Sequence, residues 1–165
     1  APYFGWAETR TFAIPEQGSV DAVFLGAHIR TPDKTSGASL INIYSLQFGF
    51  NTSVSADTNR PATFAGWIHQ TNLIGTVNWA FGCVSNSVGV TWVDSGVTYT
   101  PSTWYKLGVR MDGTNMVGYH NDVAVVTNSS NIPFGLTAGV TVRNAVISGT
   151  TTLDTTINKM AFQYK

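Results

Sequence analysis

The chain has 165 residues, a length that fits one domain with its own hydrophobic core, and its single cysteine, Cys83, cannot form an internal disulfide. Nine basic and nine acidic residues cancel, and no basic run offers a phosphate-binding surface, so nucleic acid is a poor candidate partner. No apolar run approaches the ~18 residues of a membrane span, which argues against membrane insertion. We treat residues 1–165 as one domain, and the start at Ala1 rather than Met is consistent with excision from a longer chain.

The predicted elements are all strands. Aromatic residues, Gly, Thr, Ser, Asn and Val are abundant, a composition that favours strands and turns, and no convincing helix exceeds one turn. Runs rich in β-branched and aromatic residues are expected to form strands at 9–14, 19–30, 40–50, 62–70, 77–84, 88–94, 104–111, 115–121, 123–127, 136–142 and 156–164. Eleven short strands at this spacing predict an all-β, two-sheet antiparallel β-sandwich or jelly roll.

The middle strands have alternating apolar residues, which separate core from surface. In the segments 77–83 and 88–92 the alternation predicts that Trp79 and Trp92 lie in the core. The segment 62–70 is less clear, because Trp67 and His69 point outward only if Phe64 and Ile68 are core residues.

The clearest unit is the hairpin region 104–127. In its first strand the apolar set is Tyr105, Leu107, Val109 and Met111, which leaves Trp104, Lys106 and Arg110 on the outer face. In the second strand we expect Val117 and Tyr119 to point inward and His120 outward, with Asn121 and Asp122 forming a tight turn because both residue types tolerate positive φ.

The outward residues are candidates for sugar binding. An aromatic ring covers the apolar face of a sugar, while polar groups beside it meet the hydroxyls. The competing interpretation is that this face packs on a second sheet, a loop or another subunit. The candidate ligand-binding residues are Trp104, Lys106, Arg110, His120, Trp67 and His69.

Signals for catalysis and metal binding are weak. Glycosidases usually need two carboxylates about 5–9.5 Å apart. No two acidic residues are closer than five positions in the sequence, so only a pair from distant strands remains open. His28, His69 and His120 are far apart for a zinc site. We therefore expect no catalytic residue and no cofactor, with a structural calcium ion near Asp112 as the weaker alternative.

Several segments, taken in order, resemble a known family. They are GF at 49–50, RPATFAGWI at 60–68, VNWAFGC at 77–83, VDSGV at 93–97, TWYKLGVRMDG at 103–113, VGYHND at 117–122, NIP at 131–133 and LDTTINKMAFQYK at 153–165. In this order they resemble the concanavalin A-like or laminin G-like jelly-roll domains of bacteriophage structural and tail proteins. Two departures are Asp122, where the family turn usually has Gly, and Asn158, where relatives often carry Asp.

The resemblance implies a two-sheet sandwich on the virion surface, as part of a tail fibre, head fibre or similar appendage, in an extracellular, commonly trimeric assembly. The leading hypothesis is therefore a non-enzymatic phage adhesin that recognises a host-surface glycan. One alternative is a glycan hydrolase or lyase on the same fold, with two carboxylates or a Tyr–His–Arg group in the concave cleft. Another is a purely architectural capsid or fibre domain whose outer face contacts another subunit.

Overall fold

The computed structural model describes residues 3–7, 12–33, 43–51, 63–70, 75–85, 89–148 and 154–165. Within these ranges every regular element is a β-strand, and no helix is long and apolar enough to cross a membrane. The strands are β1 (Tyr3–Ala7), β2 (Phe12–Ala13), β3 (Ala22–Arg30), β4 (Ile43–Asn51), β5 (Thr63–His69), β6 (Asn78–Ser85), β7 (Gly89–Thr98), β8 (Trp104–Asp112), β9 (Met116–His120), β10 (Val123–Asn128), β11 (Thr137–Ser148) and β12 (Thr156–Tyr164).

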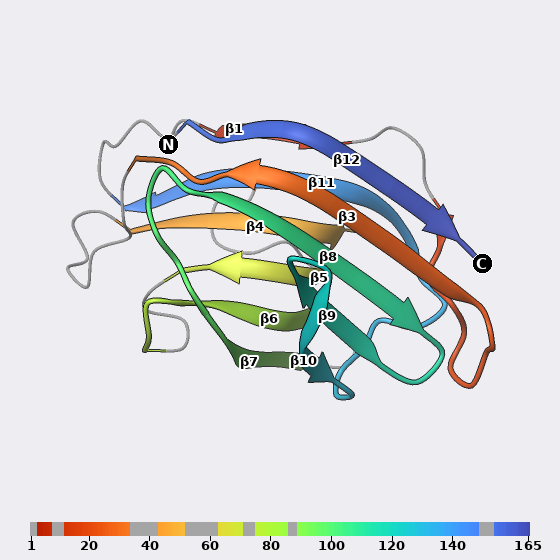
Figure 1. Ribbon diagram of the computed structural model, residues 1–165. Coiled ribbons are helices and arrows are strands. Elements are labelled where there is room, and N and C mark those ends of the chain that lie inside the picture. Colours follow the sequence, from red (N-terminus) through yellow and green to blue (C-terminus); the bar gives the residue numbers. More distant parts are fainter. Residues whose placement is uncertain are drawn as a thin grey trace.

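The strands form two antiparallel sheets, packed face to face. A seven-stranded sheet has the order β1-β11-β4-β5-β6-β7, with β2 also pairing with β11. A five-stranded sheet has the order β10-β9-β8-β3-β12 and lies in front of the first sheet in Figure 1. The prediction of an all-β, two-sheet antiparallel sandwich is confirmed.

The predicted strands agree with the structure best in the middle and at the end of the chain. The strand expected at 9–14 is described only as β2, since residues 8–11 lie outside the described ranges. β1 was not predicted, and β11 continues to Ser148, six residues beyond its expected end. β11 pairs with β2 at its start, with β4 from Gly139 to Ser148, and with β1 along the middle of its other edge.

The core lies between the sheets and is rich in aromatic residues. Trp79, Phe81 and Cys83 of β6 point into it, as their alternation predicted. The prediction for Trp92 is wrong, because that residue pairs with Gly82 and so lies on the opposite face from Phe81, where its ring is 6.2 Å from Phe64. β7 is an edge strand, and its apolar residues need not mark the core face.

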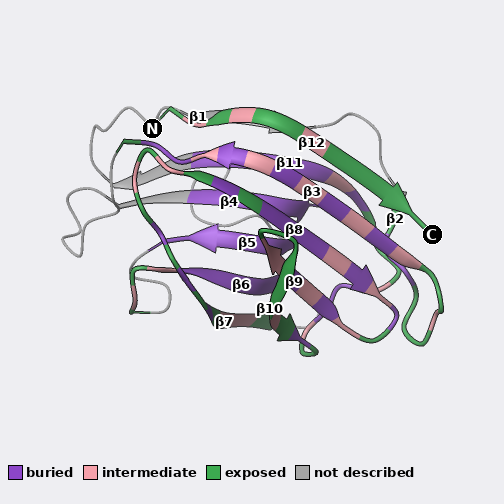
Figure 2. Cartoon of the chain, viewed as in Figure 1, coloured by how far each residue is buried: buried purple, intermediate pink, exposed green. Residues whose placement is uncertain are grey.

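The central strands of the two sheets differ in burial (Figure 2). In β3 buried and half-buried residues alternate along the whole strand, whereas all seven residues of β5 are buried. A strand covered on both sides has no polar face to reveal its orientation. The expected outward orientation of Trp67 and His69 is therefore wrong: they are 0% and 1% exposed and face the core, while Phe64 and Ile68 are buried on the other face.

The second strand of the hairpin is also reversed relative to the prediction. Met111 pairs with Met116, and both are fully buried core residues, so Val117 and Tyr119 point outward and His120 points inward. One position of difference in register exchanges the two faces of a strand. The inward set therefore includes Gly118, a residue that has no side chain to mark the core face.

Candidate functional site: a groove on the five-stranded sheet

The outer face of the five-stranded sheet carries polar and aromatic side chains from three neighbouring strands. β3 and β8 pair so that Gly26 lies opposite Gly108 and His28 lies opposite Lys106. β12 pairs with the other edge of β3 and places Lys159 opposite His28. A bulge between Ile157 and Lys159 inserts one extra residue in β12, so that Asn158 and Lys159 both reach the same surface.

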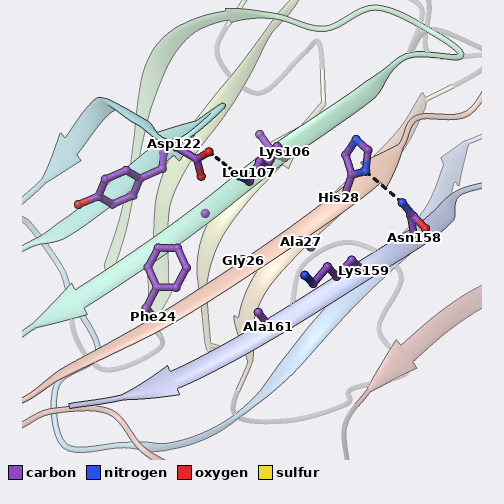
Figure 3. Close-up of a pocket in the computed structure, with 12 residues that line it drawn as sticks. Phe24, Gly26, Ala27, His28, Lys106, Leu107, Asp122, Asn158, Lys159 and Ala161 are labelled. Atoms are coloured by element: carbon purple, nitrogen blue, oxygen red, sulfur yellow. Dashed lines mark hydrogen bonds and ion pairs between the residues drawn. The ribbon is translucent and has the colours of Figure 1, made fainter.

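These residues enclose a groove of about 610 Å³. Figure 3 shows that they come from β3, β8 and β12 and from the β9–β10 hairpin. The lining residues are Phe24, Gly26, Ala27, His28, Lys106, Leu107, Gly108, Tyr119, Asp122, Asn158, Lys159 and Ala161.

One end of the groove is aromatic and has a glycine floor. The rings of Phe24 and Tyr119 meet edge to face, with centroids 6.0 Å apart. A Cβ atom added at Gly26 or Gly108 would lie 3.1 Å from the Phe24 ring, closer than most van der Waals contacts. The two glycines therefore allow the Phe24 ring to lie over β3 and β8, where it gives this end of the groove an apolar surface.

The other end of the groove is polar and cationic. His28 stacks at a tilt on Trp104, with ring centroids 4.6 Å apart, and its Nδ1 atom lies 3.4 Å from the Asn158 amide nitrogen. These two contacts hold the imidazole between Lys159 and Lys106, its register partners on the neighbouring strands. Since neighbouring strands are about 4.8 Å apart, the three basic side chains form a row of about 10 Å across the sheet.

The turn of the β9–β10 hairpin closes this row. Asn121 and Asp122 have φ values of 51° and 66°, and the Asn121 N–H donates to the Lys106 carbonyl oxygen over 2.9 Å. The Lys106 ammonium forms an ion pair with the Asp122 carboxylate (Figure 3). Both side chains are well exposed, so their pairing is screened by water.

The predicted outer residues of β8 have the expected orientation. Trp104 is 42% exposed and reaches the groove through its stack on His28, and Lys106 lines the groove directly. Arg110 also lies on the outer face but forms an ion pair of 2.6 Å with Asp112 and does not line the groove. Ligand binding by these residues stays a prediction.

Trp67 and His69 lie behind the groove, not in it. The Trp67 indole Nε1–H donates to the Gly108 carbonyl oxygen over 2.8 Å and so ties the core of the seven-stranded sheet to the groove floor. The His69 ring stacks on Tyr99 at 3.6 Å, with 9° between the planes. Burial lowers the pKa of His69 to about 4, although a hydrogen bond with the backbone of Asn78 acts in the opposite direction.

His120 is the third predicted ligand-binding residue that lies off the outer face. It is the register partner of Leu107, and its ring centroid is 5.8 Å from that of Tyr105, a core residue. Partial burial lowers the pKa of His120. The residue therefore belongs to the edge of the core beneath the hairpin, on the opposite side of the sheet from Lys106.

The sequence analysis did not predict six groove residues with polar or aromatic side chains as ligand-binding residues: Phe24, His28, Tyr119, Asp122, Asn158 and Lys159. The alternation of β3 could have revealed the first two, because Val23, Leu25, Ala27 and Ile29 form a clear apolar set with Phe24 and His28 between them. No local signal joins β12 to β3, since the paired residues are about 130 positions apart in the sequence.

No group of three or more His, Cys, Asp or Glu side chains among the described residues is placed to hold a metal ion. At the turn considered for calcium, Asp112 Oδ1 accepts hydrogen bonds from the N–H groups of Thr114 and Asn115, and Oδ2 pairs with Arg110. Burial alone would raise the pKa of Asp112, but these contacts outweigh it and the pKa lies below its usual value. The contacts give the carboxylate a structural role in the turn.

Carboxylates are rare on both sheets. Within the described ranges the strands carry two carboxylates, Asp94 on β7 and Asp112 at the end of β8. Asp94 accepts hydrogen bonds from Asn78 and from the Gly96 N–H. Asp122 is the one carboxylate among the described residues that line the groove.

Solved structures with the same fold include polysaccharide-degrading enzymes. Alginate lyase A1-II′, a member of polysaccharide lyase family 7, is 10% identical, with a TM-score of 0.61 over 93% of this chain and 65% of that one. Alginate lyase AlyC3 in complex with dimannuronate is 9% identical, with a TM-score of 0.63 over 92% and 66%. A β-1,3-glucanase from Mycobacterium marinum is 13% identical, with a TM-score of 0.61 over 96% and 67%.

At this identity the likeness shows the fold alone. The chain spans 60%, 65% and 66% of the lengths of three alginate lyases that it matches. No protein-family model matches the sequence, and no curated protein matches it either.

These comparisons correct the expected function. The hypothesis of a non-enzymatic phage adhesin is contradicted, because the similar structures are lyases and glucanases, and its phage origin has no support among them. The prediction of a protein without enzymatic activity is contradicted by the same structures. The fold part of the resemblance is confirmed: the chain is a concanavalin A-like jelly-roll sandwich.

Proposed function

We propose that the protein degrades acidic polysaccharides as a lyase, with the groove on the five-stranded sheet as its reaction site. The observation that carries the proposal is a single groove with the row of Lys159, His28 and Lys106 at one end and Tyr119 at the other. The fold is shared with alginate lyases and glucanases, which makes a glycan substrate the natural candidate.

The groove residues favour elimination over hydrolysis. A glycosidase typically uses two carboxylates about 5–9.5 Å apart, and Asp122 is the only carboxylate among the described groove residues. Elimination from a uronate sugar needs other groups. A base removes the proton on the carbon next to the sugar carboxylate, the bond to the leaving glycosidic oxygen breaks, and a carbon–carbon double bond forms. Cations that neutralise the sugar carboxylate make that proton easier to remove.

The groove offers one side chain or pair for each task. In our proposal Lys159 and Lys106 bind the carboxylates of the polymer. His28 accepts the proton on Nδ1, where the substrate takes the place of the Asn158 amide N–H, and the Trp104 ring orients the imidazole. The Tyr119 hydroxyl group donates a proton to the leaving oxygen, and the Phe24 ring carries the apolar face of a neighbouring sugar. Of the residues expected from the sequence, Lys106 thus has a ligand-binding role in this proposal, whereas Trp104 acts through His28.

The test is incubation of the purified chain with polymannuronate, polyguluronate, polygalacturonate and a neutral β-1,3-glucan. Elimination leaves an unsaturated uronate at the new chain end, which is followed by its ultraviolet absorbance. We expect product from at least one uronate polymer and none from the glucan. If the glucan releases reducing ends and the uronate polymers give no unsaturated product, the protein is a hydrolase and the lyase proposal is wrong.

Two variants and a matched control locate the reaction. His28→Ala should lower the rate of elimination by about 10²-fold or more, as expected for loss of a proton-transfer group. Lys159→Ala should weaken substrate binding, whereas Lys165→Ala removes the same charge near the same end of the chain but outside the groove and should behave like the unchanged protein. Full activity of His28→Ala would reject the groove as the reaction site.

A homo-oligomer, a trimer in particular, stays a prediction, as does a location at a virion surface or elsewhere outside the cell.

A further inference from the structure

The turn at the closed end of the groove contains a residue that the turn itself does not favour. Asn121 and Asp122 both have positive φ, and the second position of such a turn is the one that most favours glycine. An aspartate there is held in a less stable backbone conformation than glycine would have. The carboxylate of Asp122 therefore calls for an explanation beyond turn formation.

The contact made by this carboxylate is with the groove. It forms an ion pair with Lys106, at the end of the row that begins with Lys159 and continues through His28. The two side chains are 55% and 72% exposed, so the pair adds little to stability and opens easily. Lys106 is thus kept in place by an internal carboxylate that another carboxylate can replace.

We infer that Asp122 is a specificity-determining residue whose carboxylate exchanges with that of a bound acidic sugar. This inference rests on the proposed function, because it takes the groove as the place where a uronate polymer binds. In the free protein Asp122 neutralises Lys106 and repels further anions. A uronate that enters the row must displace Asp122 from Lys106, so the groove admits sugars that bring a carboxylate to this position and gives neutral sugars no such exchange.

The experiment measures binding by titration calorimetry with two probes, a mannuronate oligosaccharide and a neutral β-1,3-glucan oligosaccharide of equal length. The variants are Asp122→Asn, which removes the charge, and Asp122→Gly, which also relieves the positive φ. The matched control is Asn121→Gly, which relieves positive φ in the same turn and keeps the carboxylate.

We expect both Asp122 variants to bind the mannuronate oligosaccharide about 3- to 10-fold more tightly at low salt, the size of one exposed charge interaction. Their affinity for the neutral oligosaccharide should not change, and Asn121→Gly should match the unchanged protein with both probes. Adding Lys106→Ala to Asp122→Asn should abolish the gain. An unchanged affinity for mannuronate in Asp122→Asn, or an equal gain for the neutral probe, overturns the inference.

The binding experiment on Asp122 and the elimination assay of the proposed function can fail independently of each other. Mannuronate binding that tightens in Asp122→Asn, without any unsaturated product, overturns the lyase proposal and leaves the exchange of carboxylates in place. Elimination by the unchanged protein, without tighter binding in Asp122→Asn, overturns only the role of Asp122. If neither the unchanged protein nor Asp122→Asn binds the mannuronate oligosaccharide, the inference is overturned as well.

Discussion

β5 and β8 are inner strands of opposite sheets, and their sequences differ in how clearly they show which face of the strand is buried. In β8 the exposed residues Trp104 and Lys106 alternate with the buried Tyr105 and Leu107, so the strand reveals its outer face in its sequence. In β5 all seven residues are buried, and nothing in the strand itself tells Phe64 from Trp67. A strand that is covered on both faces can contact a surface site only from the core side, whereas a strand with one open face can place side chains in the site.

The largest expected difference between the two strands concerns their glycines. A Cβ atom at Gly66 in β5 would lie 2.3 Å from the backbone oxygen of Phe48, and its φ of 152° disfavours other residues. Gly66→Ala should lower the free energy of unfolding by about 3 kcal/mol or more, measured by urea denaturation. Gly108→Ala in β8 is the control, since its Cβ would meet only side chains at 3.1 Å or more, and about 1 kcal/mol is expected. Equal losses would remove the contrast between the strands.

The next effect is the pH dependence that β5 contributes through His69. Burial lowers its pKa from 6.5 to about 4, so between these pH values the unfolded chain binds a proton that the folded protein excludes. The free energy of unfolding should therefore be greatest above pH 6.5 and fall by about 3 kcal/mol on the way to pH 4. His69→Phe keeps an aromatic ring against Tyr99 and should remove most of this slope in urea titrations across the range. If His69→Phe loses as much stability between pH 6.5 and pH 4 as the unchanged protein, other groups cause the pH dependence.

The smallest effect on stability is expected on the open face of β8. Lys106 is exposed and its ion pair with Asp122 is screened, so Lys106→Ala should change the free energy of unfolding by less than about 0.5 kcal/mol. The same variant should bind a uronate oligosaccharide more weakly in calorimetry. A large loss of stability, with binding unchanged, would make Lys106 a structural residue like those of β5.

The sequence predicted the sandwich because alternation and turn residues are local properties of the chain. It placed Trp104 and Lys106 on the outer face for the same reason. It could not place Tyr119 and His120, because the inward position between Met116 and His120 is Gly118. The groove escaped prediction as a unit, since it depends on the pairing of β3 with β8 and with β12, which joins residues about 80 and 130 positions apart.

The hydrogen bond from Trp67 to the Gly108 carbonyl oxygen has a further consequence. It fixes the floor of the groove to a tryptophan that is fully enclosed by the core, before any ligand arrives. If the groove binds a sugar as we propose, its backbone needs little ordering, and most of the conformational entropy lost on association comes from the sugar and the long lysine side chains. For the proposed polysaccharide substrate we therefore expect a stiff polymer to bind better than a flexible oligosaccharide, which would lose more entropy for the same contacts.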